Sequence, residues 1–295
     1  MTLRIALADT IPNITPSALR AHLSQTAPSP LHLPGLVSAW PALYKWTLSD
    51  GLRAIRDAVG EQRAVEVEVG QKGRGYLDQR YQRVTMGFGL FLDAFILSLI
   101  PSSSPDSLPT AYLAQSDLLE IPSVLKDVSP PLEHFSSGPR SEIWRRTIWI
   151  GPKGSWTPFH RDPYIGLYTQ IIGSKRFRLL PPSASTYLKP SPNVPHTNTS
   201  TILLSSSNLL RSSLEPDILL PSSNLLRPDD ELDADDDIQQ STIQEYREQL
   251  RGAFAQDGAC QVTLKQGDSV LVPEGWWHEA EGLDGPGIGA GSWFR

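Results

Sequence analysis

The sequence predicts a mainly β protein with helices, in which short strands form a sandwich or barrel joined to an N-terminal α/β portion. In the C-terminal half, short apolar and β-branched runs alternate with turns rich in glycine and proline, a pattern typical of a sandwich or barrel. The 22 glycines and 26 prolines in 295 residues agree with a chain that turns often. Apolar residues at helical spacing occur mainly in the first third of the chain.

Local patterns predict the N-terminal elements. A helix is expected to begin after Thr15, because Pro16 suits the first turn of a helix. Apolar spacing predicts an amphipathic helix over residues 49–59 and an aromatic-rich helix over 86–100, whose stripe we interpret as a packing surface and not as a cofactor contact. Residues 64–69 alternate between valine and a polar or small residue, which predicts a half-buried strand.

The remaining elements are expected to be mostly strands. The sequence predicts a helix over 243–254 and strands over 110–115, 145–150, 167–172, 175–180, 261–264, 269–273 and 289–294. Two of these strands are separated only by Gly173-Ser174, which is the spacing of a tight hairpin turn. We therefore expect 167–172 and 175–180 to pair as a hairpin.

Residues 189–240 differ in composition from the rest of the chain. Serine, proline, asparagine and aspartate dominate, and the run 202–211 returns in similar form at 218–227. Two copies are too few for a repeat architecture. We interpret 189–240 as a low-complexity, flexible surface insertion, with a docking arm as the alternative. The predicted organisation is an N-terminal portion over 1–120 packed on a barrel core over 121–295, which contains the insertion.

Composition argues against several classes of partner and compartment. The net charge of −6 disfavours a nucleic-acid or anionic-membrane partner, although much of it lies in the acidic run 229–237. The single cysteine, Cys260, excludes an internal disulfide and fits a reducing compartment. We expect neither a signal peptide nor a membrane span, because the N-terminus lacks a basic-then-apolar pattern and no run of about 18 apolar residues occurs. The expectation is an intracellular protein of the cytoplasm, the nucleus or both.

His160 and Asp162 are the strongest candidates for metal ligands. Side chains two residues apart on an extended strand leave the same face. A distant histidine, His278, follows two tryptophans and would complete a set of two imidazoles and one carboxylate. That set leaves coordination sites open and is typical of non-haem Fe(II) oxygenases. The other histidines lack patterned neighbours and are expected at the surface: His22, His32, His134 and His196.

These motifs resemble the JmjC-domain family. The motifs are His160-x-Asp162, Gly173-Ser174-Lys175 and the run from Gly267-Asp268 to Trp276-Trp277-His278. Segments around Trp40, Tyr112 and Trp149 are similar to the protein-hydroxylase branch, which contains arginyl and asparaginyl hydroxylases. The resemblance covers about residues 30–188 and 255–295. It implies a double-stranded β-helix, the cupin-type jelly roll, and an oxygenase that uses Fe(II), 2-oxoglutarate and O₂.

The resemblance also assigns roles to residues. His160, Asp162 and His278 would bind Fe(II), which leaves sites for a bidentate 2-oxo acid and for O₂. Lys175 would bind the distal carboxylate of 2-oxoglutarate, since a compact ammonium suits a single carboxylate. Thr157 would share that carboxylate. Further pocket positions are expected at Tyr112, Trp149 and Ser292.

Two features depart from the family pattern. Relatives usually carry an asparagine six residues past the first ligand, where this chain has Gly166. The resemblance therefore does not determine how the cosubstrate is arranged in the pocket. The last predicted strand contains Gly287, Gly289 and Gly291, and glycines weaken a strand interior.

The implied function is hydroxylation of a protein side chain, with arginine or asparagine favoured and with succinate and CO₂ as co-products. Histone lysine demethylation is an alternative, although the chain contains no recognisable histone-reading segment. A wybutosine-type tRNA-base hydroxylase is another, which the acidic balance disfavours. The non-enzyme alternative is a catalytically silent cupin-like binding module. The expected partner is a protein substrate, and a homodimer is left open.

Overall fold

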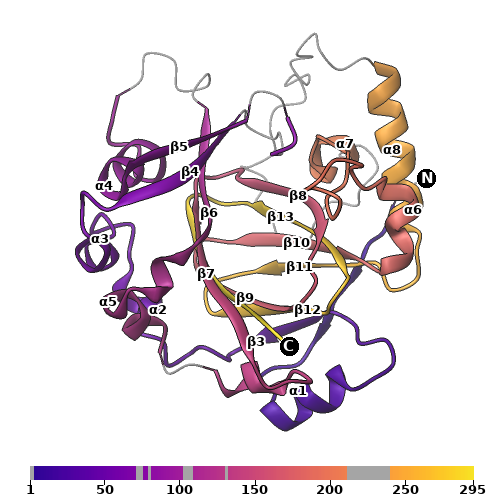
Figure 1. Ribbon diagram of the computed structural model, residues 1–295, viewed down its shortest axis with the longest axis horizontal. Coiled ribbons are helices and arrows are strands. Elements are labelled where there is room, and N and C mark those ends of the chain that lie inside the picture. The colour runs from indigo at the N-terminus through magenta and orange to yellow at the C-terminus, as the bar shows by residue number, and fades with distance from the viewer. Residues whose placement is uncertain (1–2, 71–75, 79–80, 102–108, 130–131, 211–239) are drawn as a thin grey trace.

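Two β-sheets face each other in the computed structural model (Figure 1). The structure describes residues 3–70, 76–78, 81–101, 109–129, 132–210 and 240–295. The smaller sheet contains, in order, β1 (Ala6–Leu7), β11 (Cys260–Leu264), β10 (Lys175–Leu180), β13 (Trp277–Gly282) and β8 (Trp156–Arg161). The larger sheet contains, in order, β2 (Asp9–Thr10), β3 (Leu31–Pro34), β12 (Asp268–Val272), β9 (Ile165–Ile172), β14 (Gly287–Phe294), β7 (Ile143–Gly151), β6 (Thr110–Ser116), β4 (Ala64–Gly70) and β5 (Gln82–Gly87).

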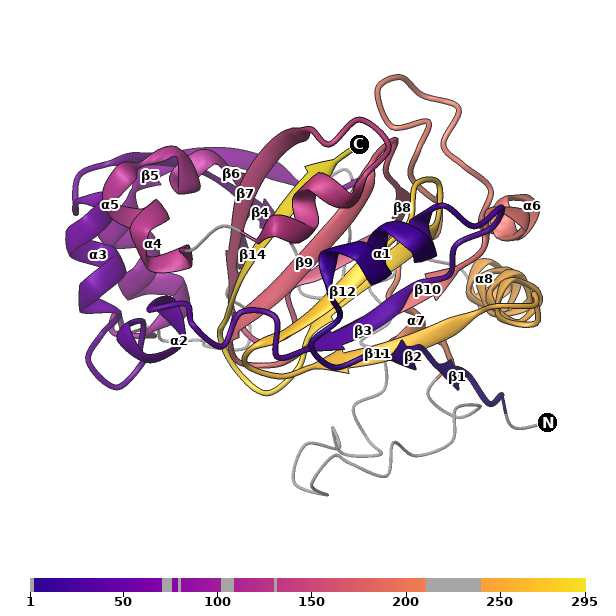
Figure 2. The same cartoon turned by 90° about the horizontal axis from the view of Figure 1, so that it is seen from below.

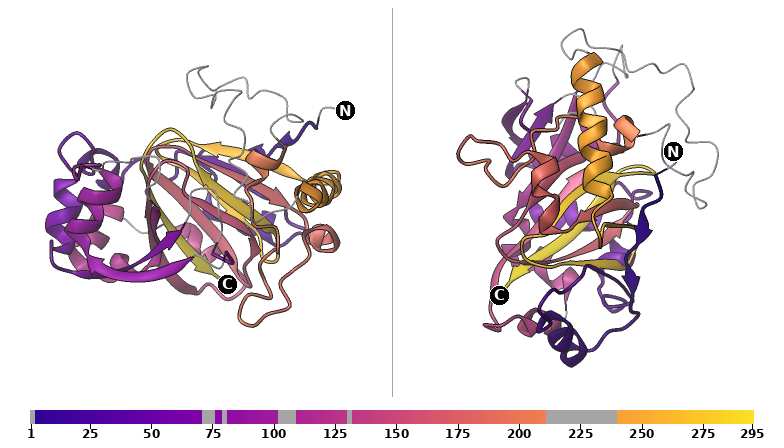
Figure 3. Two further views of the ribbon diagram at one scale, coloured as in Figure 1. Left: turned by 90° about the horizontal axis from the view of Figure 1, so that it is seen from above. Right: turned by 90° about the vertical axis from the view of Figure 1, so that its right-hand side faces the viewer.

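Helices cover the outer faces of the two sheets. On the side of β4 to β7 lie α2 (Ala42–Lys45), α3 (Arg53–Val59), α4 (Phe88–Phe91) and α5 (Pro122–Leu125) (Figure 1). Along the smaller sheet lie α6 (Ser185–Leu188), α7 (Ser206–Leu210) and α8 (Gln240–Phe254), as Figure 3 shows. The helix α1 (Pro16–Leu23) lies over the larger sheet near β3 (Figure 2). Within the described part of the chain, no helix has the length and apolarity that crossing a membrane requires.

The strands from β8 onward cross repeatedly between the sheets, which is the arrangement of a cupin-type jelly roll. From β8 to β14, the chain alternates between the smaller and the larger sheet, except that β10 and β11 pair within the smaller one. The mainly β jelly-roll fold is therefore confirmed.

The predicted hairpin between 167–172 and 175–180 is wrong. β9 pairs with β12 and β14, whereas β10 pairs with β11 and β13. Gly173 turns the chain from one sheet to the other at a positive φ of 74°, and a Cβ there would lie 2.6 Å from the Pro286 carbonyl oxygen. The two-residue spacing fits both a hairpin within one sheet and a turn between two sheets. It could not distinguish them, because the pairing partners come from sequence-distant strands.

The predicted N-terminal elements form with shifted boundaries. Thr15 caps α1, since its hydroxyl accepts a hydrogen bond from the Ala18 N–H at 3.2 Å. The helix predicted over 49–59 begins only at Arg53, after Leu52 adopts a left-handed conformation. The helix predicted over 86–100 is shorter, because the chain up to Gly87 belongs to β5, which sequence patterns missed. Its aromatic stripe packs in the core as expected: Phe88, Phe91, Leu92 and Ile96 are buried.

The described part of the segment 189–240 differs from the predicted surface insertion. Ile202, Leu204, Leu209 and Leu210 are buried in a cluster with residues of β8, β10, β13, α6 and α8. They pack there because this face of the smaller sheet is apolar and needs a cover. The second copy of the run and the acidic stretch, at 218–227 and 229–237, lie outside the described residues.

Candidate active site

His160, Asp162 and His278 converge at one end of the smaller sheet. His160 on β8 lies directly opposite His278 on β13, and Asp162 follows the last residue of β8. The two imidazole centroids are 4.2 Å apart, and His278 Nε2 lies 3.7 Å from Asp162 Oδ2. One ligand atom from each of the three residues lies within 4.8 Å of the others. A single metal ion would fit among these atoms.

Backbone carbonyls set the orientation of both imidazoles. His160 Nδ1 lies 2.9 Å from the Pro158 oxygen, and His278 Nδ1 lies 3.2 Å from the Trp276 oxygen. An Nδ1–H that donates to a carbonyl leaves Nε2 with a free lone pair, which is the form that binds a metal. Burial and the neighbouring His160 lower the pKa of His278, which keeps its imidazole neutral. The donor set therefore fits a divalent transition metal such as Fe(II).

Lys175 is a buried cation in the same pocket. Its Nζ donates to the Tyr112 hydroxyl at 3.0 Å and lies 5.2 Å from the ring centroids of both Tyr112 and Tyr168. Among the described residues, none places a carboxylate within ion-pair distance of this ammonium. Burial lowers the pKa of Lys175 to about 7. Since an unpaired buried charge is costly, this position favours an anionic ligand.

All eight residues predicted for the site line one pocket between the sheets. They are His160, Asp162, His278, Lys175, Thr157, Tyr112, Trp149 and Ser292. Thr157 hydrogen-bonds the Tyr112 hydroxyl, so it lies beside the ammonium of Lys175. The structure thus brings the predicted residues together, while their roles as ligands stay predictions. The other four histidines are partly exposed and lie outside this metal-ligand cluster.

Sequence patterns missed several lining residues, among them Glu68, Tyr76, Tyr168 and Trp293. Glu68 belongs to the alternating run 64–69, whose pattern predicts a half-buried strand but not what its polar face contacts. Its strand pairs with β6, which places Glu68 opposite Tyr112. Burial raises the pKa of Glu68, although Tyr81 and Arg83 oppose this shift.

The glycines of β14 make room for pocket aromatics. A Cβ at Gly289 would collide with the Tyr168 hydroxyl, and one at Gly291 would lie 2.6 Å from the Trp149 ring. Gly166 is different, since a Cβ there would make ordinary contacts of 3.8 Å with Trp293. The side-chain-poor strand is therefore explained by the rings that it accommodates.

Comparisons with known proteins agree with this geometry. Residues 17–295 match the model of the cupin-like domain. The chain belongs to the cupin-like domain family. It is 29% identical to JmjC domain-containing protein D of Dictyostelium discoideum over 175 residues. This match covers 56% of the chain and 38% of that protein. It is 27% identical over 256 residues to lysine-specific demethylase JMJ30 of Arabidopsis thaliana, covering 86% and 47%, and 26% identical over 258 residues to lysine-specific demethylase 8 of Xenopus tropicalis, covering 86% and 46%.

The JmjC resemblance predicted from the motifs is confirmed for this cupin-like chain, while the protein-hydroxylase branch stays a prediction. The chain spans less than half the length of each of these three relatives.

Proposed function

We propose that this cupin-like protein is an Fe(II)- and 2-oxoglutarate-dependent oxygenase. The observation that carries the proposal is the combination of the His160, Asp162 and His278 ligand set with the buried ammonium of Lys175 in one pocket. A ligand set alone would suit many metal sites. A cation in the same pocket without an acid partner additionally selects a dianion such as 2-oxoglutarate.

The pocket residues have three roles: they bind the metal, neutralise the carboxylate of the cosubstrate and exclude water. The two histidines and Asp162 hold the metal, which when bound supplies O₂ activation coupled to decarboxylation of 2-oxoglutarate to succinate and CO₂. Lys175, with the hydroxyls of Tyr112 and Thr157, binds the distal carboxylate of the cosubstrate. The remaining wall includes aromatic rings that would exclude water from the reacting C–H bond: Tyr76, Trp149, Tyr168, Phe177 and Trp293.

We infer a basic protein side chain as the substrate, with arginine in first place. Glu68 places a carboxylate in the pocket, and the ring of Tyr76 lines it as well. A guanidinium both pairs with a carboxylate and stacks on an aromatic face. These features support arginine better than asparagine, which carries no charge. Arg83 lies 3.7 Å from Glu68 but is largely exposed, so it neutralises this carboxylate only weakly.

Lysine demethylation is the second candidate. A methylated lysine is also a cation that Glu68 would attract, and two of the relatives carry the name lysine-specific demethylase. Hydroxylation of an N-methyl group and of a side-chain carbon use the same oxidant, so the pocket supports both outcomes. A tRNA base is less well supported, because the protein is acidic. A protein partner in the reducing cytoplasm or nucleus remains our proposal.

Succinate formation from 2-oxoglutarate, with added Fe(II) and with His160→Ala as the control, tests the activity. If the wild type forms no more succinate than this variant and binds no 2-oxoglutarate, the silent binding module replaces the enzyme proposal.

The substrate is tested with matched peptides that contain arginine, asparagine or trimethyl-lysine, and with tRNA. We expect a one-oxygen mass gain on the arginine peptide. Loss of a methyl group from the lysine peptide alone would favour the demethylase, and modification of tRNA alone would refute a protein substrate.

A further inference from the structure

Trp293 connects the two sheets across the pocket. It lies on β14 of the larger sheet, and its indole Nε1 donates a hydrogen bond of 2.8 Å to Oδ2 of Asp162, which follows β8 of the smaller sheet. The indole nitrogen can only donate, so Asp162 Oδ2 is the acceptor of this hydrogen bond. This hydrogen bond therefore reaches a carboxylate oxygen of one of the three metal-ligand residues.

The backbone and the carboxylate of Asp162 are held by different contacts. The Gly275 N–H donates to the Asp162 carbonyl oxygen at 3.1 Å, which fixes the backbone beside β13. A fixed backbone leaves the carboxyl plane free to turn, since the terminal torsion of an aspartate is broad. Within the described residues, the indole of Trp293 makes the hydrogen bond that restricts this rotation.

The indole is itself held by its strand and by neighbouring rings. Trp293 pairs with Gly166 of β9 and Arg145 of β7, and the register shifts directly after it, an irregularity that re-aims side chains. Trp149 and Trp144 contact its ring edge to face, at centroid distances of 5.8 and 6.3 Å. Gly166 opposes it without a side chain, and a Cβ there would lie 3.8 Å from Nε1.

We propose, on the basis of the metal site of the proposed function, that Trp293 is a positioning residue that sets the orientation of the Asp162 carboxylate for metal binding. Groups that hydrogen-bond a metal ligand typically change metal affinity by about 10- to 100-fold when they are removed.

Mn(II) affinity, measured by calorimetry or by the electron paramagnetic resonance signal of the free ion, tests the proposal without turnover. In Trp293→Phe an aromatic ring remains but the indole N–H is lost, and we expect Mn(II) to bind about tenfold more weakly or worse. Trp144→Phe is the matched control, since it changes a ring in the same cluster that does not reach Asp162. This control is expected to bind Mn(II) within about twofold of the wild type, because Trp144 contacts no ligand.

Unchanged Mn(II) affinity in Trp293→Phe would overturn the proposal, as would an equal loss in Trp144→Phe, which would assign the effect to ring packing. Failure of the proposed function looks different, because the wild type would then bind no Mn(II) and consume no 2-oxoglutarate.

A second measurement needs no substitution at Trp293 and remains valid if that variant fails to fold. The indole N–H signals of the ¹⁵N-labelled wild type are recorded with and without Zn(II), and again in Asp162→Asn. We expect one indole signal to move both on Zn(II) addition and in the variant. If no indole signal responds to both changes, Trp293 does not hold the carboxylate.

Discussion

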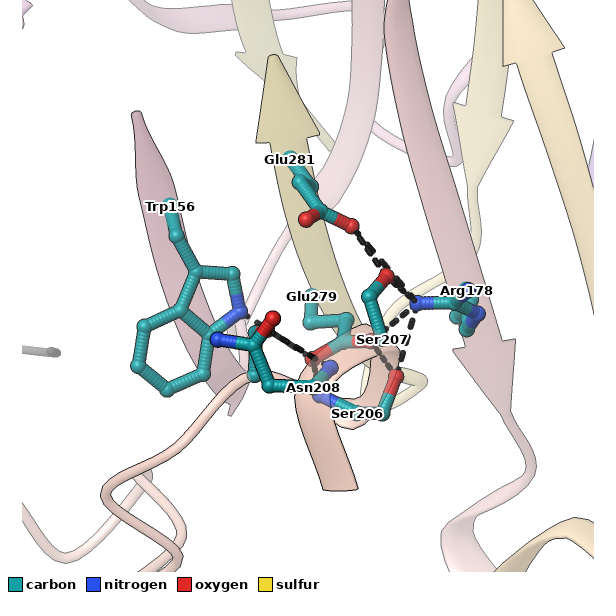
Figure 4. A network of polar contacts seen from close by, with 8 residues as sticks. Trp156, Arg178, Ser206, Ser207, Asn208, Glu279 and Glu281 are labelled. Carbon is teal, nitrogen blue, oxygen red and sulfur yellow. Dashed lines mark hydrogen bonds and ion pairs between the residues drawn. The ribbon is translucent and has the colours of Figure 1, made fainter. Parts of the chain in front are cut away.

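Two of the buried cations on strand β10, Lys175 and Arg178, have opposite surroundings. Lys175 faces the pocket between the sheets, whereas Arg178 lies on the outer face of the smaller sheet against α7 (Figure 4). The side chains of Arg178 and Glu279 are both 2% exposed and form an ion pair of 3.0 Å. The same guanidinium nitrogen donates to the hydroxyls of Ser206 and Ser207 at 2.8 and 2.9 Å.

Lys175 lacks comparable partners. Its ammonium has the Tyr112 hydroxyl and two ring faces, but no carboxylate among the described residues. Around Arg178, in contrast, the protein itself supplies the counter-charge, because Glu279 pairs with this guanidinium and also accepts from the Trp156 indole at 3.1 Å. The comparison teaches that a buried charge is structural where the chain itself supplies the opposite charge. A buried charge without such a partner points to a ligand that supplies it.

Removing the paired cation should have the largest effect. Arg178→Met leaves Glu279 buried without its cation, and we expect a loss of about 3–5 kcal/mol in the free energy of unfolding, measured with urea. Arg178→Met combined with Glu279→Met removes both charges and should recover most of that loss. A loss below about 1 kcal/mol in the single variant would mean that the pair behaves like an exposed one.

Removing the unpaired cation should weaken 2-oxoglutarate binding and should not destabilise the fold. In Lys175→Met we expect 2-oxoglutarate affinity, measured by calorimetry with Mn(II), to fall by about 100-fold or more. Stability should stay unchanged or rise, because an unpaired buried charge is removed. Mn(II) affinity serves as the internal control. Unchanged cosubstrate affinity would refute the role of Lys175.

The titration of Lys175 should appear as a pH dependence. Burial lowers its pKa from 10.5 to about 7, so between these values the unfolded chain holds a proton that the ligand-free folded protein lacks. The contribution of Lys175 to stability therefore rises with pH across this window.

Binding of 2-oxoglutarate has the opposite dependence, because it needs the ammonium. Its affinity should fall above pH 7, by up to about tenfold per pH unit. Calorimetry at pH 8 in buffers of different ionisation enthalpy should show proton uptake on binding. Absence of uptake would place the pKa outside this range.

The smallest expected effect concerns Glu68, the acid at the substrate side of the pocket. In Glu68→Gln we expect KM for an arginine peptide to rise about five- to tenfold, since one partly exposed ion pair is lost. The requirement for 2-oxoglutarate should not change. An equal rise in KM for an asparagine peptide would show that Glu68 affects the shape of the pocket and does not recognise the charge of the substrate.

The metal-ligand positions could be predicted because their signal is local. His160 and Asp162 stand two apart next to a turn, and His278 belongs to a second compact motif. The jelly roll followed from the same motifs and from many short strands. Lys175 was predicted as a cosubstrate ligand, but its lack of an acid partner is a property of the packed structure.

Features that depend on pairing register could not be predicted. Glu68 enters the pocket because β4 pairs with β6, and Trp293 reaches Asp162 because β14 lies between β7 and β9. The supposed hairpin failed for the same reason. The run around Ile202 was assigned to a flexible insertion because its serine-rich composition outweighed its few apolar residues, which only the outer face of the smaller sheet explains.

The position of β14 also bears on the order in which the molecule assembles. This strand lies between β7 and β9, although more than a hundred residues of chain separate it from both, as the partners Gly287–Gly151 and Phe294–Ile165 show. Such non-local pairing is entropically costly and slow to form. We therefore expect closure of the larger sheet to be a late folding event, and full metal affinity to develop only after it, because Trp293 lies on β14.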